Sequence, residues 1–403
     1  MVVILGAGFA GLTAARELEK IAEVTLVDRH NFQTFLPLLY QVSSAGLAAD
    51  HVAYPIRGAL RKKKIDFRMG SPIRIDHKNK EVTLDSGENL NFDFLIIALG
   101  SATNDFGIPG VFENALGMKT INEALRIRAK IMRHFEDLCR FKDDSRLSIN
   151  VIGGGPTGVE MAGAIAELKK GPLSSDNYLA AEKIDISIVE AGPRLLPSFS
   201  ESLSIKAQRD LEKLGVRVIT QASVQKLSSN RIYLQDEAEL KTEITIWAAG
   251  VKGEPIINSL DLPIVSNRIA VNQTLQVQNH SNIFAIGDVA AVLGKDGKLL
   301  PMVAPVALQQ GKFVAKQISK AALNKTLGEF KYLDKGSMAT IGRHKAIVEV
   351  RNLRFSGAIA WYVWLWLHLF YLLGGRNKIA TSVDWFWNYL TFDRGNRHII
   401  DIE

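Results

Sequence analysis

The stretch that decides the fold is MVVILGAGFAGLTAARELEK, residues 1–20. A short apolar run, 2–5, leads into Gly6, Gly8 and Gly11, and helix-forming residues follow. Glycine is needed at the tight turn, where the backbone approaches a pyrophosphate, and where the helix packs on the strand. The phosphates would bind at the helix N-terminus. This stretch therefore predicts a strand–turn–helix unit for a dinucleotide.

A second strand, EVTLVD, follows and ends in Asp28, 22 residues after Gly6. The dinucleotide fingerprint has a ribose-binding carboxylate at about this distance. The alternative is a glycine-rich turn with an unrelated surface aspartate.

The same pattern returns in LSINVIGGGPTGVEMAGAIAELKK, residues 147–170, with Gly153, Gly155 and Gly158. The next strand, in IDISIVEAGPRLLP, ends in Glu190, after an apparent insertion at residues 169–183. Two fingerprints in β-α-β context make a chance match improbable. The sequence therefore predicts two dinucleotide-binding folds in one chain.

Three further strands end in small residues: FDFLIIALGSAT, EITIWAAGV and SNIFAIGDVA. The third ends in Gly287 and Asp288, and such an aspartate can bond a polyol chain. The alternative is a plain helix N-cap.

Composition excludes several classes of protein. At 403 residues the chain has room for two or three domains, and its net charge of +7 is not clustered as in a nucleic-acid-binding arm. Cys139 is the single cysteine, so no disulfide framework or redox cysteine pair exists and a reducing compartment is expected. The sequence shows no signal peptide and no metal-binding motif.

Taken together, the motifs of residues 1–345 resemble the two-dinucleotide-binding-domain flavoprotein superfamily. The resemblance implies FAD in the first fold and NAD(P)H in the inserted second fold, with Asp28 on the FAD adenosine ribose and Asp288 on the ribityl chain. The domains expected are 1–112 (FAD, first part), 113–255 (NADH), 256–345 (FAD, second part) and 346–403 (membrane-associating tail).

Within that superfamily, disulfide reductases and sulfide:quinone reductases need cysteines that this chain lacks. The closer resemblance is to type II NADH:quinone oxidoreductase, the single-subunit, non-proton-pumping dehydrogenase. It is carried by GGGPTGVEMAGAIAEL, FLPLLYQVSSAG and VAPVALQQGKFVA, and by the tail segment ending WFWNYLTFDRGNR. One departure is Pro305, which stands where many members carry a quinone-site glutamine.

The resemblance assigns site residues by position. For non-covalent FAD they are Gly6, Gly8, Phe9, Ala10, Gly11, Asp28, Arg29, Ile73, Gly100, Gly287, Asp288, Ala304 and Pro305. For NADH they are Gly153, Gly155, Pro156, Thr157, Gly158, Glu190 and Gly250, and for the quinone Ala304, Gln309 and Gln310.

For two glutamates, both a functional role and a non-functional role fit the sequence. Glu190 should bond the adenosine ribose and disfavour NADPH, or else be a solvent-facing strand end. Glu160 is assigned by the resemblance to the nicotinamide and quinone side of the flavin, as a positioning or proton-relaying group, and is the one catalytic residue expected. Otherwise it only complements the helix dipole.

The tail reads AIAWYVWLWLHLFYLLGG, residues 358–375, and later DWFWNY. From 358 to 373 the run has 16 residues and His368 as its one strongly polar side chain, which is short of the ~20 that a span requires. Tryptophan and tyrosine favour the headgroup boundary. The tail is therefore expected to form two helices lying in one leaflet, with Arg376, Lys378, Arg394 and Arg397 meeting anionic lipid. The alternative is that these helices pack against a second subunit or cover the core.

The fold class expected is α/β, with two Rossmann-like domains and an amphipathic helical tail. The function expected is transfer of hydride from NADH to FAD and of two electrons to a membrane quinone, by a peripheral homodimer on the cytoplasmic face of a prokaryotic plasma membrane. Two alternatives stay open: a reductase of a small iron–sulfur protein, and a non-enzymatic redox sensor.

Overall fold

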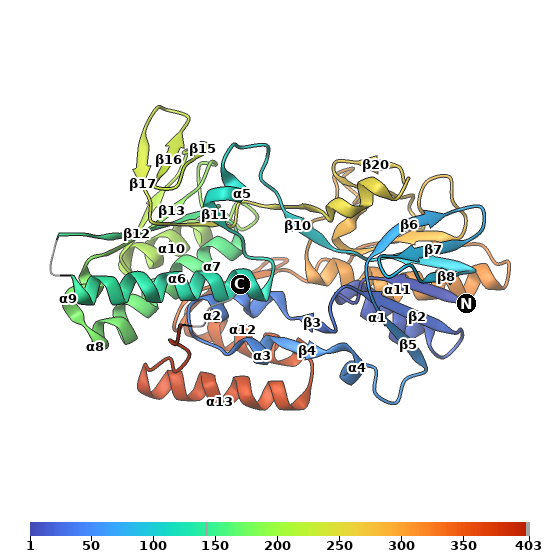
Figure 1. The fold of residues 1–403 in the computed structure, drawn as a ribbon, viewed down its shortest axis with the longest axis horizontal. Helices are drawn as coiled ribbons and strands as arrows, with labels where there is room; N and C mark the ends of the chain where they lie inside the picture. The colour runs from blue at the N-terminus through green and yellow to red at the C-terminus, as the bar shows by residue number, and fades with distance from the viewer. Residues whose placement is uncertain (142–143, 400–403) are drawn as a thin grey trace. The chain divides into compact units, whose positions relative to one another are not determined.

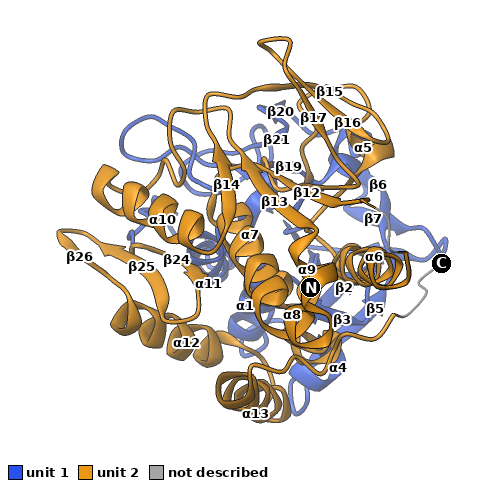
Figure 2. Cartoon of the chain, turned by 90° about the vertical axis from the view of Figure 1, so that its left-hand side faces the viewer, with its two compact units in different colours: residues 1–33, 54–102, 251–334 blue, residues 34–53, 103–250, 335–403 orange. Residues whose placement is uncertain are grey.

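The computed structural model describes residues 1–141 and 144–399, and the chain divides into two compact units (Figure 2). Unit 1 comprises residues 1–33, 54–102 and 251–334. Unit 2 comprises residues 34–53, 103–250 and 335–403. These boundaries differ from those expected at 112, 255 and 345, and residues 34–53 join the unit of the second glycine motif, which sequence reasoning did not foresee.

Unit 1 is built on a five-stranded parallel sheet in the order β22-β9-β1-β2-β5. Every residue of the central strand β1 is buried, which is why its sequence is a continuous apolar run and not an alternating one. The strand bounds are β1 Val2–Leu5, β2 Val24–Asp28, β5 Ile65–Met69, β9 Phe94–Ile97 and β22 Ile283–Ala285.

Two helices of unit 1, α1 (Phe9–Leu18) and α11 (Ala304–Ala322), lie side by side (Figure 1). The smaller strands of this unit are β6 Pro72–Asp76, β7 Glu81–Leu84, β8 Asn89–Asn91, β20 Ile264–Val265, β21 Arg268–Ala270 and β23 Ala290–Ala291. Its short helices are α4 Ile56–Ala59, η3 Pro255–Ser259 and η4 Gly287–Val289, and strands β3 Phe32–Thr34, β4 Ala53–Pro55, β10 Ser101–Thr103 and β19 Val251–Gly253 lie where the chain passes between units.

Unit 2 repeats the plan of unit 1 with a second five-stranded parallel sheet, in the order β11-β18-β12-β13-β14. Strand β12 takes the place of β1, and β13 takes the place of β2. The bounds are β11 Ala115–Leu116, β12 Leu147–Ile152, β13 Ile184–Val189, β14 Val216–Ile219 and β18 Ile244–Trp247.

The helices of unit 2 surround that sheet (Figure 2). The longest is α6 (Ile121–Arg140), which begins at a capping box formed by Thr120 and Glu123. The others are η1 Leu36–Leu38, α2 Leu39–Ser43, α3 Ala49–Val52, α5 Val111–Asn114, α7 Pro156–Leu168, the π-helical turn η2 Lys169–Leu173, α8 Ser174–Asp176, α9 Tyr178–Glu182 and α10 Glu201–Lys213. A three-stranded sheet, β15 Val224–Leu227, β16 Arg231–Leu234 and β17 Glu239–Lys241, completes this part.

The C-terminal part of unit 2 is a three-stranded antiparallel sheet followed by two helices. The strands are β24 Ser337–Gly342, β25 Lys345–Val350 and β26 Leu353–Ser356, and the helices are α12 Ala358–Tyr371 and α13 Gly375–Thr391. Helix α12 packs on β25, and α13 packs on α12 and on α3. Asn377 of α13 donates from its side-chain amide to the carbonyl oxygens of Asp50, His51 and Ala53, at 3.0, 3.0 and 2.9 Å.

The expected fold class is confirmed: the molecule is α/β, with two Rossmann-like folds and a helical tail. Within residues 1–141 and 144–399, no helix has the length and apolar character needed to cross a membrane.

The contact between α7 and β24 depends on Gly163. A Cβ atom at this position would lie 1.9 Å from the carbonyl oxygen of Ile341, which is backbone and cannot move aside. We expect Gly163→Ala to lower the free energy of unfolding of unit 2 by about 1–3 kcal/mol. All six tryptophans lie in unit 2, so urea unfolding followed by tryptophan fluorescence measures this directly.

The matched control is Gly375→Ala, because a Cβ at this helical glycine meets nothing within 4 Å. It should leave the unfolding midpoint unchanged or slightly raised. Equal behaviour of the two variants would contradict the close approach of α7 and β24.

Candidate functional site

The first glycine turn, residues 6–11, has the geometry that its spacing predicts. Gly6 has φ +103°, and a Cβ there would lie 2.3 Å from the carbonyl oxygen of Ala98. A Cβ at Gly11 would lie 1.8 Å from the Gly6 oxygen, so the helix and the strand meet backbone to backbone. Gly8 is different, because its backbone is extended and nothing lies within 4 Å of its Cβ position. The open space at Gly8 lets a ligand reach the backbone.

The second glycine turn, residues 153–158, repeats each of these features. Gly153 has φ +110° and its Cβ would lie 2.6 Å from the oxygen of Ala248. A Cβ at Gly158 would lie 1.9 Å from the Gly153 oxygen, whereas Gly155 is extended and open. The two folds therefore carry the same turn.

The strand-end carboxylates are also placed alike. Asp28 accepts a hydrogen bond of 2.6 Å from the Ala7 amide and one of 2.8 Å from the His30 amide. Glu190 accepts two bonds of 2.6 Å, from the amides of Gly154 and Gly192. In each case one amide follows the first glycine of the turn and the other lies two residues past the carboxylate, so the acid is fixed beside the open glycine.

These arrangements fit a dinucleotide in each unit. The open glycine would take the pyrophosphate, the helix N-terminus would offer amides to it, and the fixed carboxylate would face the ribose hydroxyls.

The other residues assigned to the FAD site lie in several elements of unit 1. Asp288 accepts a bond of 2.6 Å from the Ser101 hydroxyl. Arg29 is paired with Glu254 at 3.0 Å. Pro305 lies in the first turn of α11, where no amide hydrogen is required. The rest are Phe9 and Ala10 at the start of α1, Gly100 after β9, and Ile73 on β6 with an exposed side chain. In unit 2, Pro156 and Thr157 begin α7, and Gly250 follows β18.

The two glutamines of α11 have partners within the protein. The buried side chain of Gln310 accepts a bond of 2.6 Å from the Gly287 amide. Gln309 donates to the Leu333 carbonyl at 2.9 Å and accepts from the Leu333 amide at 3.0 Å. Gln310 therefore holds the loop before Asp288, a role that the sequence analysis did not assign to it.

Glu160 lies in the first turns of α7, among side chains of β24, α2 and α12. Its carboxyl oxygen accepts a bond of 3.2 Å from the Thr340 amide. Burial raises the pKa of this carboxyl to about 8, against which the Thr340 amide and then the Trp364 indole act only in part. Glu160 is therefore mostly protonated at neutral pH and able to donate a proton.

A cavity of about 350 Å³ opens beside Glu160, within unit 2. It is lined by residues of α2, α7, the β24–β25 turn, α12 and α13. Glu160 lines this cavity together with Tyr40, Thr340 and Trp364. Burial, followed by the nearby Glu160, raises the pKa of Tyr40, so its hydroxyl stays neutral.

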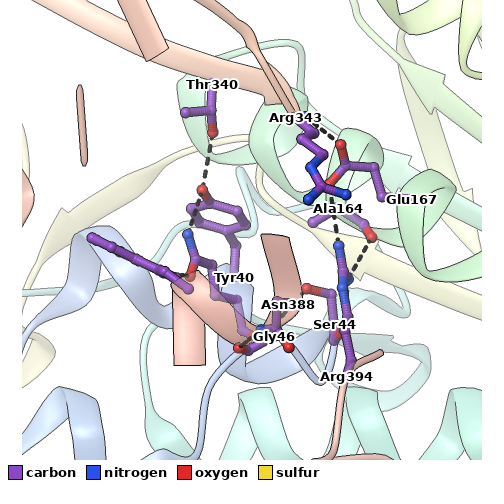
Figure 3. Close-up of polar contacts among 11 residues, drawn as sticks. Tyr40, Ser44, Gly46, Ala164, Glu167, Thr340, Arg343, Asn388 and Arg394 are labelled. Atoms are coloured by element: carbon purple, nitrogen blue, oxygen red, sulfur yellow. Dashed lines mark hydrogen bonds and ion pairs between the residues drawn. The ribbon is translucent and has the colours of Figure 1, made fainter. Parts of the chain in front are cut away.

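A chain of hydrogen bonds joins α13 to this cavity (Figure 3). The Trp385 indole donates to Gln41 at 2.7 Å, and the Gln41 amide donates to the Tyr40 hydroxyl at 3.1 Å. The Tyr40 and Thr340 hydroxyls are 2.9 Å apart. The tail helices are therefore integral to the cavity wall.

The expectation that Arg394 meets anionic lipid is wrong. Its largely buried guanidinium donates to the carbonyl oxygens of Ser44 (2.8 Å) and Ala164 (3.0 Å), and it pairs with Glu167 at 3.1 Å (Figure 3). Arg397 is likewise paired, with Asp176 at 3.4 Å and Asp393 at 3.0 Å. Both arginines fasten the end of the chain to unit 2, because acids and carbonyls of that unit lie within their reach.

Sequence reasoning missed several residues of the cavity. Tyr40 and Gln41 lie in FLPLLYQVSSAG, which the family resemblance had singled out as a segment without naming these side chains. Thr340 and Glu167 carry no local signal, since their roles arise from contacts between distant segments. Trp364 could not be told from its exposed neighbours by composition.

Comparison with known proteins agrees with this geometry. The pyridine nucleotide-disulphide oxidoreductase family model matches residues 1–311, and the NDH2 C-terminal domain model matches residues 335–394. The chain is 35% identical to type II NADH:quinone oxidoreductase Ndh of Mycobacterium tuberculosis, over 99% of this chain and 90% of that one. It is 32% identical to type II NADH:quinone oxidoreductase of Staphylococcus aureus, over 88% and 91%. A solved structure of NDH2 from Plasmodium falciparum in complex with NADH has the same fold, with a TM-score of 0.91 at 22% identity over 99% of both chains.

The two glycine turns and the family models define a flavin- and nicotinamide-binding oxidoreductase. The chain belongs to the type II NADH:quinone oxidoreductase family, and its cofactors are FAD and NADH.

The two open glycines allow the turns to be tested separately. Gly8→Val and Gly155→Val should both fold, because their backbones are extended and their Cβ positions are empty. Gly8→Val should purify with little flavin, measured as the ratio of flavin to protein absorbance. Gly155→Val should keep its flavin and raise the KM for NADH by roughly tenfold or more, a loss of about 1.4 kcal/mol. The same defect in both variants would contradict the assignment of one dinucleotide to each turn.

Proposed function

We propose that this protein oxidises NADH and reduces a membrane quinone. When bound, FAD accepts a hydride equivalent from NADH and passes two electrons to the quinone. The observation that carries the proposal is the presence in one chain of two glycine turns with the same close contacts and the same fixed carboxylates. Cys139 alone cannot form a redox pair, so no cysteine relay intervenes.

The residues of the chain bind FAD and NADH, orient them for transfer and supply a proton to the quinone. The first glycine turn and Asp28 hold the adenosine half of FAD, and Asp288 holds the ribityl chain. The start of α11 offers the Ala304 amide and the positive end of the helix dipole to negative charge on the flavin ring. The second glycine turn and Glu190 hold NADH, so that the nicotinamide is positioned for direct transfer.

The quinone head is assigned to the cavity beside Glu160. Aromatic and aliphatic walls suit a neutral ring, and Glu160, Tyr40 and Thr340 supply proton donors. Glu160 is proposed as the acid that protonates the reduced quinone. Contact of the quinone with Ala304, Gln309 or Gln310 stays a prediction. Gln309 would have to give up its bonds to Leu333, and Gln310 its bond from the Gly287 amide, to make it.

Nucleotide preference should follow from Glu190. A carboxylate beside the ribose repels a 2′-phosphate, so NADH should be favoured over NADPH. In Glu190→Gln the ratio of kcat/KM for NADPH to that for NADH should rise by roughly tenfold, about 1.4 kcal/mol. The exposed Glu182→Gln is the control and should not change this ratio. A kcat/KM ratio of NADPH to NADH near one in the wild type, or the same ratio in Glu190→Gln as in the wild type, would contradict the role assigned to Glu190.

The tail is proposed to bind the membrane through two outward apolar ridges. On α12 the exposed residues repeat at helical spacing, and the most exposed are Trp366 (76%) and Ile359 (73%). On α13 a similar row includes Ile379 (69%). The ridges are Ile359, Tyr362, Val363, Trp366, Leu367 and Phe370 on α12, and Ile379, Val383, Phe386, Trp387 and Leu390 on α13. Such a face, with tryptophan and tyrosine along it, suits the interface of one leaflet.

The ridges can be tested without disturbing the fold. Trp366→Asp and Phe386→Asp replace exposed side chains, and each should lower binding to lipid vesicles by at least about tenfold, because burial of a large apolar side chain contributes roughly 1.5–3 kcal/mol. The control is Leu179→Asp on α9, which adds the same acid at an equally exposed position off the ridges. Sedimentation with vesicles measures all three. Equal binding of ridge and control variants would contradict the membrane assignment.

The proposed location is the cytoplasmic face of a prokaryotic plasma membrane, since NADH is a cytoplasmic reductant and the relatives of 35% and 32% identity are bacterial. The expected homodimer stays a prediction, which light scattering of the purified protein tests.

An anaerobic two-step experiment tests the function as a whole. NADH is added to the purified protein until the flavin absorbance is lost, and then a short-chain quinone or a ferredoxin is added. Rapid return of the absorbance with the quinone supports the proposal. Return with the ferredoxin alone would indicate an iron–sulfur protein reductase, and return with neither would indicate a redox sensor.

A further inference from the structure

Helix α12 has an inward face that the membrane ridge does not explain. Trp364 lies on it with 1% of its surface exposed, although Trp366 two residues later is the most exposed residue of the helix. The Trp364 ring stacks on His368, with the ring centroids 3.8 Å apart and the planes 22° apart. It also meets the edge of Tyr40 at 6.3 Å and lies 6.2 Å from Trp385. Trp364 is therefore fixed by aromatic rings from α2, α12 and α13.

The Trp364 ring lies beside the Glu160 carboxyl group, and both residues line the cavity. Its buried indole nitrogen faces that carboxyl, and this contact lowers the carboxyl pKa, against the larger effect of burial. The contact lacks the geometry of a full hydrogen bond, and the indole nitrogen has no other partner among the described residues. The Thr340 amide meets the same carboxyl at 3.2 Å.

Among the residues that the structure describes, no cation contributes to the shifted pKa of Glu160. His368 is largely buried, and burial lowers the pKa of its ring to about 4. The ring is therefore neutral at physiological pH, and its Nδ1 carries the hydrogen that bonds the Trp364 carbonyl oxygen at 2.7 Å.

Among the other charged groups that line the cavity, Lys170 donates to the Lys213 carbonyl oxygen at 2.9 Å, and Lys345 begins β25. From the C-terminal end, Arg394 pairs with Glu167 of α7. From the β24–β25 turn, the Arg343 guanidinium lies 4.3 Å from the Tyr389 ring centre and 3.9 Å from that of Phe392. From α2, Tyr40 contributes a neutral hydroxyl. Burial away from water is thus the main influence on the pKa of the Glu160 carboxyl.

We propose that Trp364 is a positioning residue of the quinone reaction, and that the tail, besides binding lipid, completes the site by covering Glu160 so that it holds a proton for the quinone. This inference rests on the proposed function. Conversion of a quinone to a quinol takes two electrons and two protons. The electrons come from NADH through FAD. Glu160 gives one proton, its O–H bond breaking as the quinol O–H forms, and solvent supplies the second proton and then reprotonates Glu160.

The proposal makes the charge state of Glu160 depend on an indole ring. Without the ring, water from the cavity reaches the carboxyl, and its pKa falls toward the unperturbed value of about 4.3. A fall of about two pH units from a value near 8 would reduce the protonated fraction at pH 7 from about nine-tenths to about one-tenth. Quinone turnover at neutral pH should then fall roughly tenfold. The alkaline limb of its pH profile, where the rate declines as the pH rises, should move to lower pH.

The experiment compares Trp364→Ala and Trp364→Phe with Trp366→Ala in the full-length, flavin-loaded protein. Infrared spectroscopy at pH 7 follows the band of the protonated carboxyl group, identified by its loss in Glu160→Gln. A short-chain quinone gives the pH profile of turnover, and NADH-dependent flavin bleaching is measured separately. We expect Trp364→Ala to lose most of the band and to shift the alkaline limb down, with bleaching retained. Trp364→Phe keeps an apolar ring over the carboxyl and should restore both band and limb.

Trp366→Ala removes the same side chain from the opposite face, and should weaken vesicle binding without moving the band or the limb. The proposal is overturned if Trp364→Ala keeps the wild-type band, or if Trp366→Ala changes band and limb as Trp364→Ala does. If Trp364→Ala does not fold, Trp364→Phe and Trp364→Leu take its place in the test. Both variants should then keep the infrared band of the protonated carboxyl group. Loss of that band in both would overturn the proposal. Failure of the proposed function looks different, because Glu160→Gln would then turn over quinone with the wild-type pH profile.

Discussion

The structure depends on a backbone contact made once in each unit: the third glycine of the turn lies against the carbonyl of the first. No side chain fits there, so the helix starts directly above the end of the central strand, and its amides face the space that the middle glycine leaves open. The carboxylate at the end of the next strand then bonds the amide after the first glycine. One kind of contact thus shapes, in both units, the place where the phosphates and the ribose of a dinucleotide would bind.

The outer and inner faces of the two tail helices make different contacts. Their outer ridges are apolar and exposed, whereas their inner faces place Trp364 beside Glu160 and Trp385 on Gln41. Arg394 fastens the end of the chain to Ser44, Ala164 and Glu167. If the same helices bind lipid and also line the cavity at Glu160, as proposed, their packing would link binding at a membrane to protonation of the quinone.

Sequence reasoning predicted what depends on local spacing. The glycine turns, Asp28 and Glu190 belong to local motifs, so the motifs were sufficient to predict two dinucleotide-binding folds. The family resemblance then supplied FAD and NADH as the cofactors. Sequence reasoning missed what long-range packing decides. Residues 34–53 join unit 2, Gln310 holds the Gly287 amide, and Arg394 turns inward to an acid more than two hundred positions away. Trp364 and Trp366 look alike in sequence because both faces of α12 are apolar, so hydrophobic spacing could not show which one is buried.

The most direct test of the central claim, that two like turns hold two different dinucleotides independently, is a calorimetric titration. Protein stripped of flavin is titrated with FAD, and the loaded protein is then titrated with an NADH analogue that cannot transfer hydride. The account predicts one FAD per chain and one analogue per chain, with neither displacing the other, and loss of only the second binding event in Gly155→Val. Competition between FAD and the analogue for one site, or loss of both events in Gly155→Val, would contradict it.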